Sequence, residues 1–125
     1  MDHSKEFLEL VNEVLPRVKE VSVAEAIERR VGGATLIDVR EDNEWKSGYA
    51  DGAIHLSRGV IERDIVHQIP NKDAELILYC GGGYRSALAA DSLRKMGYTN
   101  VLSMAGGWTA WKDAGAPTDI DDMPF

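Results

Sequence analysis

The sequence predicts an α/β domain in which helices cover both faces of a mostly parallel β-sheet. Short apolar segments typical of strands alternate with amphipathic segments typical of helices between residues 4 and 114. The strand segments 35–39 and 75–80 are apolar on both sides of the alternation, as expected for strands buried on two faces. The alternative architecture is a mixed α+β sheet with one antiparallel edge strand.

The N-terminal half is expected to contain three helices and three strands. Residues 4–15 predict an amphipathic helix that Ser4 caps and Pro16 ends. A second helix begins at the capping-box pattern of Ser22 and Glu25 and ends at the glycine pair 32–33. The apolar face of the first helix consists of Phe7, Leu8, Leu10, Val11, Val14 and Leu15. The remaining elements are strands over 18–21, 35–39 and 53–56 and a short polar helix over 42–47.

The C-terminal half is expected to contain three further helices and two further strands. Pro70 ends the first of these helices, and Asp91 with Lys95 forms an i,i+4 ion pair on the second. The helices are predicted over 59–69, 86–96 and 107–114, and the strands over 75–80 and 101–104. The chain then divides into an N-terminal helical segment over 1–17 packed on the domain, a domain over 18–117, and an acidic tail over 118–125 that frays.

Composition and charge exclude several classes of partner. The 125 residues are 44% hydrophobic and 28% charged, which is typical of one globular domain. The formal charge of −7 argues against nucleic acid and anionic membranes, because both select basic surfaces. The uncharged run 96–111 is too short and too polar to span a membrane. The lone cysteine cannot form an internal disulfide, so we expect a reducing, cytoplasmic location.

The segment Cys80-Gly81-Gly82-Gly83-Tyr84-Arg85-Ser86 carries the chemistry predicted from the residues themselves. It follows a strand and precedes a helix, and ligands of open α/β sheets bind at the carboxyl ends of strands. Three glycines let the backbone turn its N–H groups toward an anion, and the helix N-terminus adds partial positive charge. Arg85 adds a full charge. These groups are expected to favour the thiolate of Cys80.

Each of these side chains also has a purely structural interpretation. A lone cysteine is commonly a small buried apolar residue, and Arg85 could form a surface ion pair. The strand-end position, the glycines and the Cys-x4-Arg spacing favour a functional Cys80 over a structural one. No Gly-Lys-Ser/Thr sequence follows the glycines, so they do not predict a nucleotide-binding loop.

Four segments in this order resemble the rhodanese family over roughly residues 18–117. They are Leu36-Ile37-Asp38-Val39-Arg40, Glu44-Trp45 with Gly48 and Gly52 to His55, the loop Cys80 to Ser86, and Val101 to Trp111 with its Gly106-Gly107-Trp108. The resemblance implies a three-layer α/β/α fold with a central five-stranded sheet. It also implies a sulfurtransferase that moves sulfur by double displacement, with Cys80 as the nucleophile and a persulfide on Cys80 as the intermediate.

The resemblance also assigns the other site residues. The backbone N–H groups of Gly81, Gly82, Gly83, Tyr84 and Arg85 would hold the transferred sulfur and the leaving group. Arg85 would bind a small anionic donor, thiosulfate or a persulfide, and Ser86 would donate a hydrogen bond to the cysteine sulfur and cap the helix. Because no second cysteine exists, the sulfur must pass to an external acceptor: cyanide, a thiol or a protein cysteine. No organic cofactor is needed.

Two departures from the family pattern bear on specificity. Tyr49-Ala50 stands where the family often has His-Ile, which we interpret as a packing change. Arg85 is the only basic side chain of the loop, so we expect weak thiosulfate binding and a larger persulfide donor or a protein partner. The alternatives are a non-catalytic binding or redox-sensing module and, less favoured, a phosphatase or arsenate reductase. Those enzymes resemble a Cys-x5-Arg pattern, which is one residue longer than the loop here.

Other polar residues receive a structural or supporting role. We expect Asp38 to accept hydrogen bonds from loop amides and Arg40 to pair with Glu44 or Asp42. His3, His55 and His67 are not spaced as metal ligands, and His3 lies in a terminus expected to fray, so no metal site is predicted. Trp108 and Trp111 are expected in the core, with one of them forming a wall of the active-site pocket.

Overall fold

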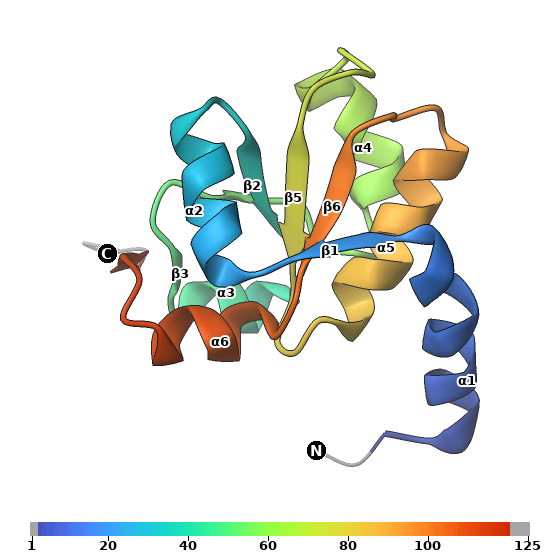
Figure 1. The fold of residues 1–125 in the computed structure, drawn as a ribbon, viewed down its shortest axis with the longest axis horizontal. Helices are drawn as coiled ribbons and strands as arrows, with labels where there is room; N and C mark the ends of the chain where they lie inside the picture. Colours follow the sequence, from blue (N-terminus) through green and yellow to red (C-terminus); the bar gives the residue numbers. More distant parts are fainter. Residues whose placement is uncertain (1–2, 121–125) are drawn as a thin grey trace.

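The computed structural model describes residues 3–120 and contains a central sheet of five strands (Figure 1). The strands are β1 (Lys19–Val21), β2 (Thr35–Asp38), β4 (Ile54–His55), β5 (Leu76–Tyr79) and β6 (Val101–Met104). Their order across the sheet is β1-β6-β5-β2-β4, and every neighbouring pair is parallel. The predicted parallel sheet is therefore confirmed. The alternative architecture, a mixed sheet with one antiparallel edge strand, is wrong.

Helices cover both faces of this sheet and bury two separate apolar layers. The helices are α1 (Lys5–Val14), α2 (Val23–Val31), α3 (Asp42–Lys46), α4 (Ile61–Gln68), α5 (Tyr84–Lys95) and α6 (Gly107–Asp113), and a 3-10 turn over Leu15–Arg17 follows α1. On one face α4 and α5 pack against Ile37, Leu76 and Leu78. On the other face α2 and α6 pack against Leu36 and Ile77. Alternate residues of β2 and β5 thus enter opposite layers, which explains why both strands are apolar throughout.

The N-terminal helix α1 lies on the outer side of α5 rather than on the sheet. Val11 and Val14 are buried against Ala87 and Leu88 of α5. The Ser4 hydroxyl accepts a hydrogen bond from the N–H of Phe7 at 3.0 Å, which is the cap that the sequence predicts. The predicted apolar face is wrong at Leu10, which is 48% exposed, because α1 packs mainly on α5 and buries only a narrow stripe.

The end of the chain forms a second, two-stranded sheet that the sequence did not reveal. Strand β7 (Thr118–Asp119) pairs antiparallel with β3 (Tyr49–Ala50). The indole N–H of Trp111 also donates to the carbonyl of Pro117 at 2.7 Å. The expectation of a frayed tail is therefore wrong for residues 118–119, and its remainder from 121 to 125 lies outside the described residues.

Of two smaller expectations, the capping box is wrong in part and the ion pair is confirmed. Ser22 accepts from the N–H of Glu25 at 3.1 Å, but the Glu25 carboxylate turns to Arg29 at 2.8 Å, so only half of the capping box forms. Asp91 pairs with Lys95 as predicted, at 3.4 Å, although its carboxylate is almost completely buried rather than solvated. Within residues 3–120, no helix is long and apolar enough to cross a membrane.

Candidate active site

Cys80 directly follows β5, the middle strand of the sheet, and begins a loop that leads into α5. Gly83 occupies the cap position of α5 with φ of 108°, a left-handed conformation that favours glycine. The helix begins at Tyr84, two residues earlier than predicted. Ser86 therefore lies inside the first turn, and its predicted role as the helix cap is wrong.

The sulfur of Cys80 lies against the N-terminal turn of α5. The N–H of Gly83 donates to Sγ at 3.0 Å, and the Ser86 hydroxyl lies 3.6 Å from Sγ. Ser86 in turn shares a hydrogen bond of 2.8 Å with Ser103 of β6, which fixes its side chain beside the sulfur. The first N–H groups of a helix have no intrahelical acceptor, so those of Tyr84 and Arg85 remain available to an anion.

The N-terminus of α6 holds the other side of this loop. The N–H of Trp108 donates to the carbonyl of Cys80 at 2.7 Å, and that of Thr109 donates to the carbonyl of Gly81 at 3.2 Å. In a trans peptide the C=O and the following N–H point in opposite directions, so the N–H groups of Gly81 and Gly82 point away from α6. Helix α6 thereby orients the peptide dipoles of the loop.

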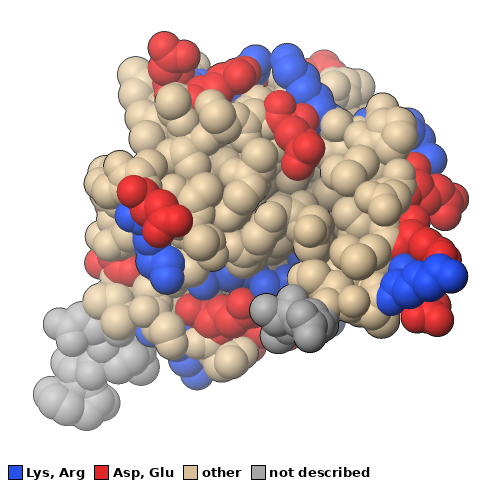
Figure 2. All heavy atoms as spheres, turned by 60° about the horizontal axis from the view of Figure 1, so that its bottom comes forward, with Lys and Arg blue, Asp and Glu red and all other residues tan. Residues whose placement is uncertain are grey.

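A cavity of about 570 Å³ opens above Cys80. Eight residues from three parts of the chain line it: His3 and Phe7 from the N-terminal segment, Asn43 and Glu44 from α3, and Cys80, Gly82, Tyr84 and Arg85 from the loop and α5. Cys80 is 1% exposed, so it lies at the base of the cavity. Figure 2 shows the underside of the molecule in Figure 1, where acidic and basic groups are interspersed.

Arg85 is held by a carboxylate from another part of the chain. Its two terminal nitrogens donate to the two oxygens of Glu44 at 2.7 and 3.1 Å. The Arg85 guanidinium lowers the pKa of Glu44, and Glu44 raises the pKa of Arg85. About a third of each side chain is exposed. The residue predicted to bind the donor anion is thus inside the cavity, but its charge is matched by a carboxylate.

Asp38 and Arg40 form a buried ion pair behind the loop. The Asp38 carboxylate accepts from the backbone N–H of Arg40 at 2.8 Å, as predicted for a loop amide, and from its guanidinium at 2.8 Å. The expectation that Arg40 pairs with Glu44 or Asp42 is wrong, because its remaining bond goes to the carbonyl of Gly48 at 2.7 Å. Both side chains are at least 97% buried, and neither lines the cavity above Cys80.

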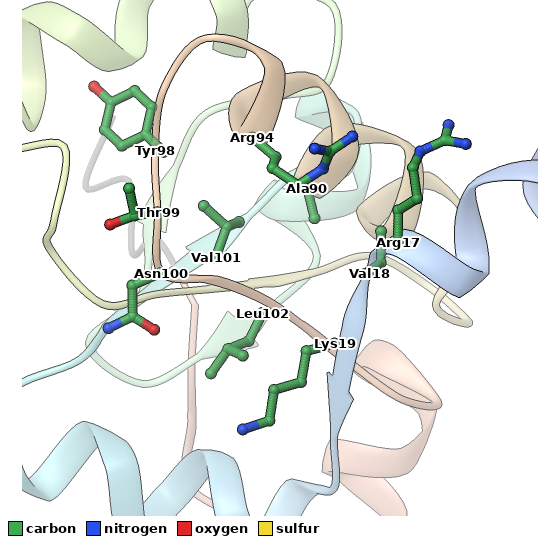
Figure 3. A pocket seen from close by; sticks show the side chains of 10 residues that line it. All are labelled: Arg17, Val18, Lys19, Ala90, Arg94, Tyr98, Thr99, Asn100, Val101 and Leu102. Carbon is green, nitrogen blue, oxygen red and sulfur yellow. The ribbon is translucent and has the colours of Figure 1, made fainter.

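A second cavity, of about 210 Å³, lies at the opposite end of the strands and is a poorer candidate for the site. Figure 3 shows its lining, which includes Arg17 and Arg94. These two cations look like an anion site, but both are bonded to the buried carboxylate of Asp91, at 3.0 and 3.1 Å. The cavity contains neither a cysteine nor a helix N-terminus, and we assign the functional site to the cavity above Cys80.

Sequence reasoning missed four residues of this cavity. His3 was assigned to a fraying terminus, yet its ring contacts Phe7 and Tyr84. The sequence places Phe7 only on the apolar face of the first helix, and Asn43 and Glu44 only in the short polar helix 42–47, because no periodicity in the sequence links α3 with α5. The expectation that one tryptophan forms a wall of the pocket is wrong, because neither Trp108 nor Trp111 lines this cavity.

The fold and this site define a class of α/β domains in which a cysteine follows the middle strand and a glycine loop leads into a helix. A family model described as the rhodanese-like domain matches residues 22–114, most of the chain. The chain belongs to the rhodanese-like domain family, as its four sequence signatures indicate.

Individual relatives bear sulfurtransferase names. The thiosulfate sulfurtransferase GlpE of Haemophilus influenzae is 32% identical over 101 residues, which are 81% of this chain and 94% of that protein. A mitochondrial protein of Schizosaccharomyces pombe, provisionally named a thiosulfate sulfurtransferase, is 34% identical over 89 residues. The match spans 62% of this chain and 63% of that longer relative.

A solved structure extends the similarity to the N-terminal helix. The protein RPA3614 of Rhodopseudomonas palustris is 27% identical, with a TM-score of 0.80 over 95% of this chain and 98% of its own. It is described as a protein of unknown function for which tyrosine phosphatase activity has been raised.

Proposed function

We propose that the protein is a sulfurtransferase that carries sulfur as a persulfide on Cys80. The Cys80 thiolate attacks the outer sulfur of a donor such as thiosulfate, the donor's S–S bond breaks, and sulfite leaves with the electron pair. An acceptor, either cyanide or a thiol, then attacks the outer sulfur of the persulfide and restores the thiolate. Because Cys80 is the only cysteine, the acceptor comes from outside the chain.

The contact between the Gly83 N–H and the Cys80 sulfur carries this proposal. Its length of 3.0 Å is short for a hydrogen bond to sulfur, and it comes from the N-terminus of a 12-residue helix. Both the N–H and the helix dipole favour negative charge on the sulfur. The remaining N–H groups of the loop, from Gly81 to Arg85, would hold the charge of the persulfide and of the departing sulfite.

The intact mass of the protein after incubation with thiosulfate tests the proposal. Wild type should gain the mass of one sulfur atom, and added cyanide should remove it while thiocyanate appears. The Cys80→Ala variant should gain nothing, and Ser92→Ala, which changes an α5 residue away from the cavity, should behave as wild type. A wild-type protein that takes sulfur from neither thiosulfate nor an organic persulfide would refute the proposal.

The description of RPA3614 supports a second candidate, a phosphatase. A phosphoryl group needs a wider ring of donors than one sulfur atom does, and the Cys-x4-Arg spacing closes a short loop here. Hydrolysis of an aryl phosphate by wild type, abolished in Cys80→Ala, would favour this candidate over sulfur transfer.

A further inference from the structure

Three aromatic rings form one wall of the cavity above Cys80. The centroid of the His3 ring lies 5.2 Å from that of Phe7 and 5.0 Å from that of Tyr84. The Phe7 and Tyr84 rings lie 6.1 Å apart in an edge-on arrangement. These separations are those of favourable aromatic pairs. We call His3, Phe7 and Tyr84 the aromatic wall.

The rest of the cavity provides little excess positive charge for an inorganic anion. Among its lining residues, the guanidinium of Arg85 and the carboxylate of Glu44 neutralise each other at 2.7 Å. Asn43, beside Glu44, is uncharged. A dianion such as thiosulfate would approach Glu44 and compete with it for Arg85, whereas an apolar group would leave this ion pair intact.

The size of the cavity also exceeds what a small sulfur anion needs. Its volume of about 570 Å³ lies in the range of sites for organic ligands. Thiosulfate has only five atoms and would touch the loop at the base while leaving the aromatic wall exposed to water. An organic group attached to the transferred sulfur would cover that wall.

From these observations, and resting on the proposed sulfurtransferase function, we propose that the aromatic wall selects an organic sulfane-sulfur donor with an apolar, ring-containing group. The reacting sulfur would lie beside Cys80 on the N–H groups of Tyr84 and Arg85, because the Gly83 N–H already binds the Cys80 sulfur, and the organic group would lie on the aromatic wall. The Cys80 thiolate attacks the outer sulfur of the donor, the bond between its two sulfurs breaks, and the organic fragment leaves with the electron pair.

Two of the three residues of the aromatic wall lie outside the family match. His3 and Phe7 precede residues 22–114, the part that matches the rhodanese-like model. The Ser4 cap and the packing of Val11 and Val14 on α5 hold this segment over the cavity. The helix outside the family match thus adds a specificity surface to the loop inside it.

Two donors with the same reactive group test the inference. Benzenethiosulfonate and methanethiosulfonate each carry one negative charge and one transferable sulfur, and they differ in the organic group. With cyanide as acceptor, kcat/KM is measured for both. We expect Phe7→Ala to lower the ratio of benzene to methane donor about tenfold, which corresponds to about 1.4 kcal/mol. His3→Ala should lower the ratio less.

Controls separate selectivity from folding. Leu10→Ala removes an exposed apolar side chain from the same helix without touching the cavity, so the ratio should stay at the wild-type value. His3 precedes the cap of α1, so its removal leaves the packing of that helix intact even if Phe7→Ala loosens it. Equilibrium dialysis with Cys80→Ser adds a readout without turnover, in which benzenesulfinate should bind more tightly than methanesulfinate.

The outcomes distinguish the inference from the proposed function. If wild type, Phe7→Ala and His3→Ala share one donor ratio, the aromatic wall has no role and the inference alone fails. If neither donor nor thiosulfate places sulfur on Cys80, the proposed function fails and the inference fails with it.

Discussion

The close approach of α6 to the active-site loop yields a sharp prediction for Gly107. A Cβ atom at this position would collide with the carbonyl oxygen of Cys80, and the three nearest atoms all belong to the backbone of Cys80 and Gly81. Gly107 also has φ of 52°, where an L-residue costs about 1–2 kcal/mol. Displacing a packed backbone adds about 1–3 kcal/mol. We expect Gly107→Ala to lose about 2–5 kcal/mol of unfolding free energy.

Gly115 provides the matched control. Its φ of 69° is similar, but a Cβ atom there would meet nothing within 4 Å. Gly115→Ala should therefore lose only the conformational contribution, about 1–2 kcal/mol. The difference between the two variants isolates the cost of separating α6 from Cys80.

Urea denaturation followed by circular dichroism measures both free energies of unfolding. The rate of persulfide formation from thiosulfate shows whether the active-site loop keeps its geometry. Gly107→Ala should slow that rate, because α6 can no longer hold the carbonyls of Cys80 and Gly81. Gly115→Ala should not slow it. Equal losses of stability and rate in the two variants would refute the idea that α6 orients the loop.

Three further substitutions test the charged groups. Glu44→Gln should lower the KM for thiosulfate roughly threefold to tenfold, because it removes one partly exposed ion pair and frees Arg85 for the donor. Steady-state kinetics that give an unchanged or higher KM would contradict this. Asp91→Asn should cost about 1–3 kcal/mol in urea melts at pH 7, because it weakens bonds to three basic side chains. Arg17 above all holds the pKa of Asp91 below its usual value, so this contribution is present above about pH 4 and is lost as the pH falls further. Wild type and variant should therefore converge toward pH 2, and a constant difference would count against the assignment. Asp38→Asn should cost about 3–5 kcal/mol by the same melts, because it leaves a buried guanidinium without its carboxylate; a loss below about 1 kcal/mol would show that the pair is not needed.

The sequence predicted the sheet well because its central strands carry a strong signal. Residues 76–79 of β5 are completely buried, so every position is apolar, and the glycines after Cys80 mark the turn into α5. Strands β3 and β7 have two residues each, too few to show alternation, and the sequence does not predict them, whereas the equally short β4 lies within the predicted strand 53–56.

The parts of the site that were missed depend on contacts between distant segments. Glu44 and Arg85 are 41 positions apart, and nothing in either local sequence reveals their pairing. His3 reaches the cavity only because α1 packs on α5, and a short polar terminus gives no hint of that packing. Local patterns thus identified the nucleophile and its loop, while tertiary packing determined what surrounds them.

The topology of the sheet has a consequence for synthesis of the chain on the ribosome. Strand β1 pairs with β6 at the edge of the sheet, and residues Lys19 to Val21 therefore lack their partner until Met104 has emerged. Strand β2, by contrast, can add its neighbours β4 and β5 earlier. Pairing between such distant segments is slow, because a long loop must close first. The nascent chain can therefore assemble from the β4 edge of the sheet toward the β1 edge, and its first strand joins last.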